Sequence, residues 1–173
     1  GSAGVQAIMP TVYPDSIQKM RESMTAIKKA MEEAVPPAKN ETASSRIIGI
    51  HLEGPFLNPQ MCGNLDKTTF LEPKEHYLRK LIEGFEDVIR IITLSPELDG
   101  ALGLISRLRD MGILVSMGHS DATYEEARAG FMKGAKGITH IFNAMRHIHH
   151  REPGIAGFGL LNQDIYIEVI ADP

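Results

Sequence analysis

Residues 46–59, RIIGIHLEGPFLNP, contain an apolar run that leads into a glutamate, a glycine and a proline, and this pattern indicates the class of fold. The apolar run is typical of a buried strand, and Glu53 ends it just before Gly54 and Pro55, where ordinary strand pairing must stop. In parallel sheets, the carboxyl ends of the strands are where α/β proteins usually keep their binding sites. A carboxylate at this point therefore predicts a functional site, provided that other polar side chains reach the same edge.

Apolar runs and helical segments alternate on both sides of this stretch. Strands are predicted at residues 5–10, 47–52, 88–94, 113–118, 137–142 and 165–172. Helices are predicted at residues 11–35, 72–85, 95–112 and 123–134, and an irregular loop rich in His and Gly at residues 143–159. Strands that alternate with helices in this way indicate a parallel β/α architecture.

The predicted helices carry local signals of their faces and ends. In the first helix, apolar residues recur at three- and four-residue spacing, at Ile17, Met20, Met24, Ile27 and Met31. Ser95 is placed to cap the third helix and Gly112 to end it. Thr123 is followed three residues later by Glu126, which is the spacing of a capping box at the start of the fourth helix.

The composition narrows the classes of function. With 173 residues, 43% of them hydrophobic and 23% charged, the chain has the length and core of one globular domain. The formal net charge of −4 gives no basic surface for nucleic acid or an anionic membrane, so neither is an expected partner. One cysteine, Cys62, excludes an intramolecular disulfide. Because the sequence shows neither a secretory signal nor an apolar run that could cross a bilayer, we expect a cytoplasmic location.

Two histidines lie at the carboxyl ends of predicted strands, as Glu53 does. His119 follows the strand at residues 113–118, and His140 lies near the end of the next strand. Because all strand ends of a parallel barrel open on one face, the three side chains can converge there despite their distance in sequence. One carboxylate and two imidazoles form a recognised ligand set for catalytic zinc, and zinc lowers the pKa of bound water to ~7. The sequence therefore predicts metal-assisted hydrolysis.

These three residues also have a purely structural interpretation. A buried glutamate at a strand end often only accepts hydrogen bonds from a loop, and a lone histidine near Gly or Thr is more often structural than a ligand. The basic loop at residues 143–159 has two interpretations as well. It could hold an anion such as phosphate through Arg and His side chains, or it could be an ordinary solvated loop. The basic residues concerned are Arg146, His147, His149, His150 and Arg151.

Four segments, HLEGPFLNP, GHSDATYEEA, THIFNAM and HHREPGIAG, occur in this order. They resemble the signature segments of the N-acetylglucosamine-6-phosphate deacetylases, a family of the amidohydrolase superfamily. The resemblance runs through nearly the whole chain and corresponds to the middle portion of a family member. It implies a metal-dependent (β/α) barrel of the TIM-barrel type that removes acetate from N-acetylglucosamine 6-phosphate to give glucosamine 6-phosphate. It also implies a cytoplasmic homodimer.

The resemblance also implies roles for individual residues. The metal ligands fall on Glu53, His119 and His140, with zinc as the common metal and iron or a second metal in some members. Asn143 and the backbone of Ala144 would contact the sugar. Arg151 would reach the sugar phosphate in the neighbouring subunit. Apart from the resemblance, the basic loop itself suggests that His150, beside Arg151, helps to hold that phosphate.

The sequence departs from the family pattern at several places. Leu65 stands where the family has a His or Gln that contacts substrate, so that contact is lost or residues are missing between Gly63 and Asn64. The segment IADP ends at Pro173, where the family continues to a substrate-binding histidine. The aspartate that serves as general base is expected outside this chain, because Asp172 is not at the matching position. We therefore expect no catalytic residue within the chain itself.

These departures define the predicted domain and the alternatives. We expect residues 1–173 to form a partial barrel of about six strands, with residues 1–4 a cloning remnant or an irregular N-terminus. One alternative is an amidohydrolase that acts on another amide or a cyclic amide. The other is an inert fragment that only binds metal or sugar phosphate.

Overall fold

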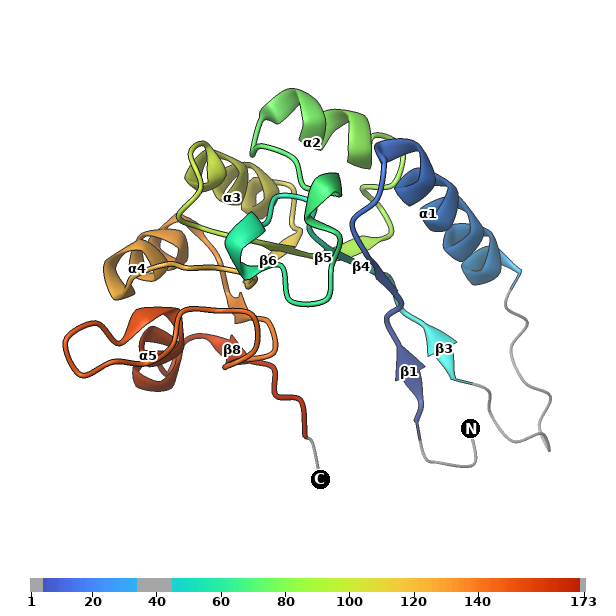
Figure 1. The fold of residues 1–173 in the computed structure, drawn as a ribbon. Coiled ribbons are helices and arrows are strands. Elements are labelled where there is room, and N and C mark those ends of the chain that lie inside the picture. Colours follow the sequence, from blue (N-terminus) through green and yellow to red (C-terminus); the bar gives the residue numbers. More distant parts are fainter. Residues whose placement is uncertain (1–4, 34–44, 172–173) are drawn as a thin grey trace.

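The computed structural model describes residues 5–33 and 45–171, and its centre is a parallel sheet of six strands (Figure 1). From edge to edge these are β2 (Thr11–Val12), β4 (Ile50–Glu53), β5 (Ile89–Leu94), β6 (Leu114–Met117), β7 (Gly137–Ile138) and β8 (Tyr166–Ile167). A separate parallel pair consists of β1 (Ala7–Ile8) and β3 (Arg46–Ile47). Apart from β3, which pairs with β1, neighbours in the sheet follow one another in the chain, which is the winding of a (β/α) barrel. The predicted α/β class is confirmed, with β2 and β8 as open edges of the described sheet.

The helices lie in an arc along one face of the sheet (Figure 1). They are α1 (Ile17–Glu32), α2 (Glu75–Ile82), α3 (Ala101–Asp110), α4 (Tyr124–Lys133) and α5 (Gly154–Leu161). Two short 3₁₀ turns, η1 (Pro59–Met61) and η2 (Lys67–Thr69), lie in the long connection after β4. Among the described residues, no helix has the length and apolar character needed to cross a membrane.

The core lies between the sheet and these helices. Leu52, Ile92 and Val115, from three adjacent strands, have no exposed surface. Met20 and Met24 of α1 are buried with them. Three partly buried residues of that helix pack against the same cluster, namely Ile17, Ile27 and Met31. The predicted apolar face of α1 is therefore confirmed.

The N-terminal strand differs from the prediction. Instead of one strand at residues 5–10, the chain forms β1 and then β2, on either side of Pro10, and the two strands join different sheets. Because proline has no N–H to donate, a regular ladder cannot continue through it. Thr11 and Val12, predicted as the start of a helix, are strand residues, and α1 begins only after Ser16, whose side chain accepts a hydrogen bond from the Lys19 N–H.

Two predictions around the later helices were wrong. Ser95 does not cap α3, which begins at Ala101 after Gly100, a glycine with φ +87°. The segment predicted as a loop contains α5, which is buried for most of its length. Its glycines misled the prediction, because here they permit close packing. A Cβ on Gly159 would lie 2.5 Å from the Cδ1 atom of Ile138.

The capping box of α4 is present as predicted. The Thr123 side chain accepts from the Glu126 N–H at 3.2 Å, and the Glu126 carboxylate accepts from the Thr123 N–H at 2.8 Å. We expect Thr123→Ala to lower the free energy of unfolding by about 1 kcal/mol, because one helix-end N–H loses its acceptor. Urea denaturation measures this loss. Thr25→Ala, at an exposed position inside α1, is the control and should cost nothing; an equal loss in both variants would contradict the capping role.

Candidate metal centre

Glu53, His119 and His140 meet at the carboxyl ends of three strands. Glu53 ends β4, while His119 and His140 each lie two residues beyond β6 and β7. The Nε2 atoms of His119 and His140 lie 2.7 Å and 3.1 Å from Glu53 Oε1, and 3.2 Å from each other. One candidate ligand atom from each residue lies within 4.8 Å of the others. This compact group of one carboxylate oxygen and two imidazole nitrogens could hold a metal ion.

The backbone around the group adopts strained conformations. His119 and His140 have φ values of +48° and +32°, and Ala144 has +47°, all in the left-handed region that residues with a side chain rarely adopt. Each such residue costs on the order of 1 kcal/mol and persists only where surrounding contacts hold it. Strain of this kind is concentrated at binding and catalytic sites in proteins.

Electrostatics keep Glu53 ionised. Burial alone raises the pKa of its carboxyl, but hydrogen bonds and charge from His119 and His140 outweigh burial and lower the pKa to about 2. For His140, burial acts to lower the pKa, while the hydrogen bond and charge of Glu53 raise it above the ordinary value. Thus the site is negatively charged when both histidines are neutral, which suits a divalent cation.

The orientation of the His119 ring is a further observation that suits metal binding by these three residues. Its Nδ1 lies 2.8 Å from the Met61 carbonyl oxygen, which can only accept, so Nδ1 carries the proton. In neutral His119 the Nε2 lone pair then faces the carboxylate oxygen of Glu53, and a cation between the two acceptors would satisfy both. A backbone carbonyl that fixes the tautomer of a ligand histidine in this way is usual in metal sites.

A buried chain of polar side chains lies further back along the same strands. His51 Nε2 is 2.8 Å from Thr93 Oγ1, which is 2.8 Å from Thr139 Oγ1, and Thr139 donates to Ser116 Oγ at 2.7 Å. Burial lowers the pKa of His51, although the charge of Glu53 opposes this. Sequence reasoning missed this chain. The signal was available, because His51 and Thr93 alternate with apolar neighbours along β4 and β5.

A pocket of about 680 Å³ opens over the candidate ligands, a size that suits a small molecule. Asn143 and Ala144, for which the resemblance implies contacts with a sugar, line it, and so does Leu65. Sequence reasoning missed its other lining residues, Tyr13, Pro14, Gly63, Asn64, Asp66 and Ile170. Asp172 and Pro173 lie outside the described residues, as do residues 1–4.

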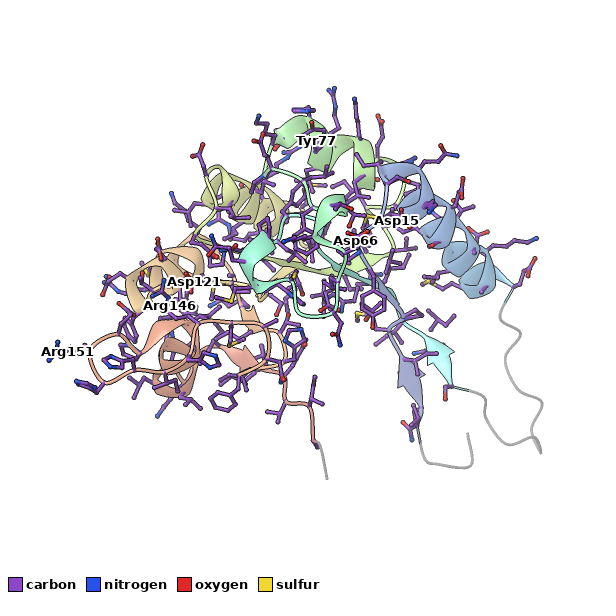
Figure 2. All side chains as sticks on the ribbon, viewed as in Figure 1. Asp15, Asp66, Tyr77, Asp121, Arg146 and Arg151 are labelled. Carbon is purple, nitrogen blue, oxygen red and sulfur yellow. The ribbon has the colours of Figure 1, made fainter. Side chains whose placement is uncertain are left out.

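The basic loop is divided between two environments. Arg146 Nη2 forms an ion pair with Asp121 Oδ2 at 2.9 Å, and its Nε donates to the Asp121 carbonyl at 2.7 Å (Figure 2). Two nitrogens of this guanidinium are therefore engaged within the chain. His150 and Arg151 are exposed and do not line the pocket, and Arg151 lies at the outer tip of its loop (Figure 2).

The pKa shift of Glu53 predicts how the stability of the metal-free protein depends on pH. Because the folded pKa of about 2 lies below the ordinary value of 4.5, the unfolded chain binds a proton first as the pH falls. The contribution of Glu53 to stability is therefore complete above pH 4.5 and is lost as the pH falls from 4.5 toward 2. Urea denaturation at several pH values, with a chelator present, measures this loss. Glu53→Gln should show a shallower decline, and an equal decline in both proteins would contradict the assignment.

The sequences of several named enzymes align with almost the entire chain. No family model matches the chain. N-acetylglucosamine-6-phosphate deacetylase from Vibrio furnissii is 36% identical over 169 residues, which cover 98% of this chain and 41% of the relative. N-acetylgalactosamine-6-phosphate deacetylase from Escherichia coli is 34% identical, over 98% of this chain and 43% of the relative.

Solved structures give the same result. N-acetylglucosamine-6-phosphate deacetylase from Thermotoga maritima superposes with a TM-score of 0.84 at 33% identity, over 99% of this chain and 44% of that one. A variant of the Mycobacterium smegmatis enzyme, in complex with N-acetyl-D-glucosamine-6-phosphate, superposes with a TM-score of 0.85 at 29% identity, over 96% and 41% of the two chains. The chain spans about two fifths of the length of the relatives it matches, and in sequence and fold it belongs to the N-acetylglucosamine-6-phosphate deacetylase family.

Proposed function

We propose that residues 1–173 are a partial (β/α) barrel catalytic domain of a cytoplasmic, metal-dependent deacetylase. The reaction is removal of acetate from N-acetylglucosamine 6-phosphate to give glucosamine 6-phosphate, a step in the breakdown of amino sugars. The observation that carries this proposal is the convergence of Glu53, His119 and His140 in a pocket shared with Asn143. Membership of the family and the sugar-phosphate complex of the M. smegmatis enzyme support the choice of substrate.

In this proposal Glu53, His119 and His140 hold a divalent cation, with zinc preferred and iron or a second metal also compatible with these ligands. When bound, such a cation polarises a carbonyl and lowers the pKa of bound water to ~7. Glu53 supplies the fixed negative charge, and the two histidines supply neutral nitrogens when their Nδ1 atoms carry the protons. Proton transfer to the leaving amine falls to an aspartate outside this chain, as the resemblance implies.

The remaining residues position the substrate. Asn143 and the backbone of Ala144 are in the pocket and would hold the sugar next to the candidate ligands. Holding the amide at the reacting centre converts binding energy into rate, because orientation is fixed before the reaction. Arg151 and His150, exposed on the outer loop, would bind the phosphate of a substrate held by the neighbouring subunit of a homodimer. A guanidinium matches the oxygen geometry of a phosphate.

A second substrate has specific support. The E. coli relative named for N-acetylgalactosamine 6-phosphate matches as much of this chain as the V. furnissii relative does. The two sugars differ only in the configuration of one hydroxyl group. The apolar Leu65 side chain in the pocket offers no hydrogen bond that would read such a difference.

The test is release of acetate by the zinc-loaded protein, with the segment that carries the expected aspartate present, from each phosphorylated sugar and from unphosphorylated N-acetylglucosamine. Both phosphorylated sugars should release acetate. The unphosphorylated sugar should react far more slowly, because the basic loop binds the phosphate group. Arg151→Ala should raise KM for the phosphorylated sugar at least about tenfold, the loss of one charge-assisted contact. Arg128→Ala, on the exposed face of α4, is the matched control. Equal rates with and without the phosphate, or hydrolysis of unrelated amides alone, would contradict the proposal.

A further inference from the structure

Glu97 joins the loops that carry the candidate metal centre, although it does not line the pocket. It lies shortly after β5 and is partly buried. Its Oε1 accepts from the Asn58 side-chain Nδ2 at 2.9 Å and from the Asp121 N–H at 2.7 Å. Its Oε2 accepts from the Ser120 hydroxyl at 2.7 Å. One carboxylate therefore connects the segments that follow β4 and β6.

The first of these segments sets the direction of the His119 ring. Asn58 caps the 3₁₀ turn η1, because its Oδ1 accepts from the Gln60 N–H at 2.9 Å and its carbonyl from the Met61 N–H at 2.9 Å. Met61 in turn presents the carbonyl oxygen that lies 2.8 Å from His119 Nδ1. By holding the Asn58 side chain, Glu97 fixes the acceptor that decides the tautomer and rotation of this imidazole.

The second segment holds the backbone of the same histidine. Ser120 and Asp121 directly follow His119, whose φ of +48° must be maintained by contacts around it. Ser95 adds to this, since its hydroxyl donates to the His119 carbonyl at 2.7 Å and accepts from the Asn58 N–H at 2.8 Å. The backbone and the ring of His119 are thus both held by residues that Glu97 connects.

We propose that Glu97 is a positioning residue, which fixes the imidazole of His119 in the orientation that a bound cation requires. This proposal rests on the proposed function, because it presupposes a metal at Glu53, His119 and His140. A carboxylate suits the role, since an ionised carboxylate has only acceptor atoms and can accept all three hydrogen bonds. The three donors are uncharged, so no ion pair explains the residue type at this position.

The test measures metal affinity, by competition with a chelator for zinc, and the visible absorption of the cobalt(II) form. Glu97→Ala should lower the affinity about 10- to 100-fold, the range for residues that orient metal ligands. It should also change the cobalt spectrum, because the geometry of one ligand changes. Glu97→Gln should restore most of the affinity, because its amide oxygen still accepts from Asn58 and Asp121.

Glu126→Ala is the matched control. It removes another glutamate that accepts from a backbone N–H and a hydroxyl, in the capping box of α4, and should lower stability without changing metal affinity or the cobalt spectrum. If Glu97→Ala does not fold, Asn58→Ala takes its place and should lower the affinity about tenfold, since it cuts the link to Met61.

The outcomes separate this proposal from the proposed function. If the unchanged protein binds neither metal, both are overturned. If it binds metal and Glu97→Ala binds equally well with the same spectrum, only the positioning role is wrong. If Glu126→Ala loses as much affinity as Glu97→Ala, the effect is a general loss of stability and the positioning role is again wrong.

Discussion

Replacing His119 with alanine is expected to lower the affinity for zinc more than about 100-fold and, under the proposed function, to abolish deacetylation. Loss of a residue that only orients a ligand costs 10- to 100-fold, so loss of a ligand atom must cost more. The His119 Nε2 lies at 2.7 Å from Glu53 Oε1, and its removal leaves that carboxylate with one imidazole partner instead of two. Metal content after dialysis and acetate release, measured on the same sample, check the two effects together.

The control for this variant is His76→Ala, which removes an exposed imidazole on α2 that is not part of the candidate centre. It should leave both metal content and acetate release unchanged. Full deacetylation by the His119→Ala protein would end the proposal that this residue is a metal ligand.

Replacing Leu52 with alanine is expected to cost roughly 2–5 kcal/mol of stability. Leu52 has no exposed surface and lies in β4, directly before Glu53, where it packs between the sheet and the helices. Removal of its side chain leaves a cavity that the strands on both sides cannot fill. In a chain of this length the loss corresponds to a fall in Tm of roughly 4–20 °C, which calorimetry measures.

Leu161→Ala is the matched control, because this leucine at the end of α5 is 72% exposed. It should change Tm little, since surface substitutions usually stay within about 0.5 kcal/mol. A similar fall in Tm for both variants would show that burial against the sheet does not decide the stability of β4.

The sequence predicted the parts of the fold that depend on local patterns. The apolar spacing in α1, the capping box of α4 and the end of α3 near Gly112 each need only a few neighbouring residues, and the structure contains all three. The errors come from tertiary contacts. Pro10 separates two strands that pair with different partners, and the glycines of α5 serve close packing instead of a loop.

The candidate site shows the same division. Glu53, His119 and His140 could be found from the sequence, because strand ends of a parallel sheet lie on one edge and their residue types suit a metal. The roles of Met61 and Glu97 could not be found, since they depend on how loops from different strands meet. The sequence predicts a helix cap at Ser95 because serine commonly has that role, whereas the hydrogen-bond partners of its side chain are in two other loops.

Diffraction from a crystal grown with zinc, recorded on both sides of the zinc absorption edge, would show whether Glu53, His119 and His140 bind the metal. We expect an anomalous peak within bonding distance of Glu53, His119 and His140, at about 2.0–2.2 Å from one oxygen and two nitrogens. An anomalous peak only at another position, or no peak at this position with zinc in excess, would contradict the proposal that these three residues bind zinc.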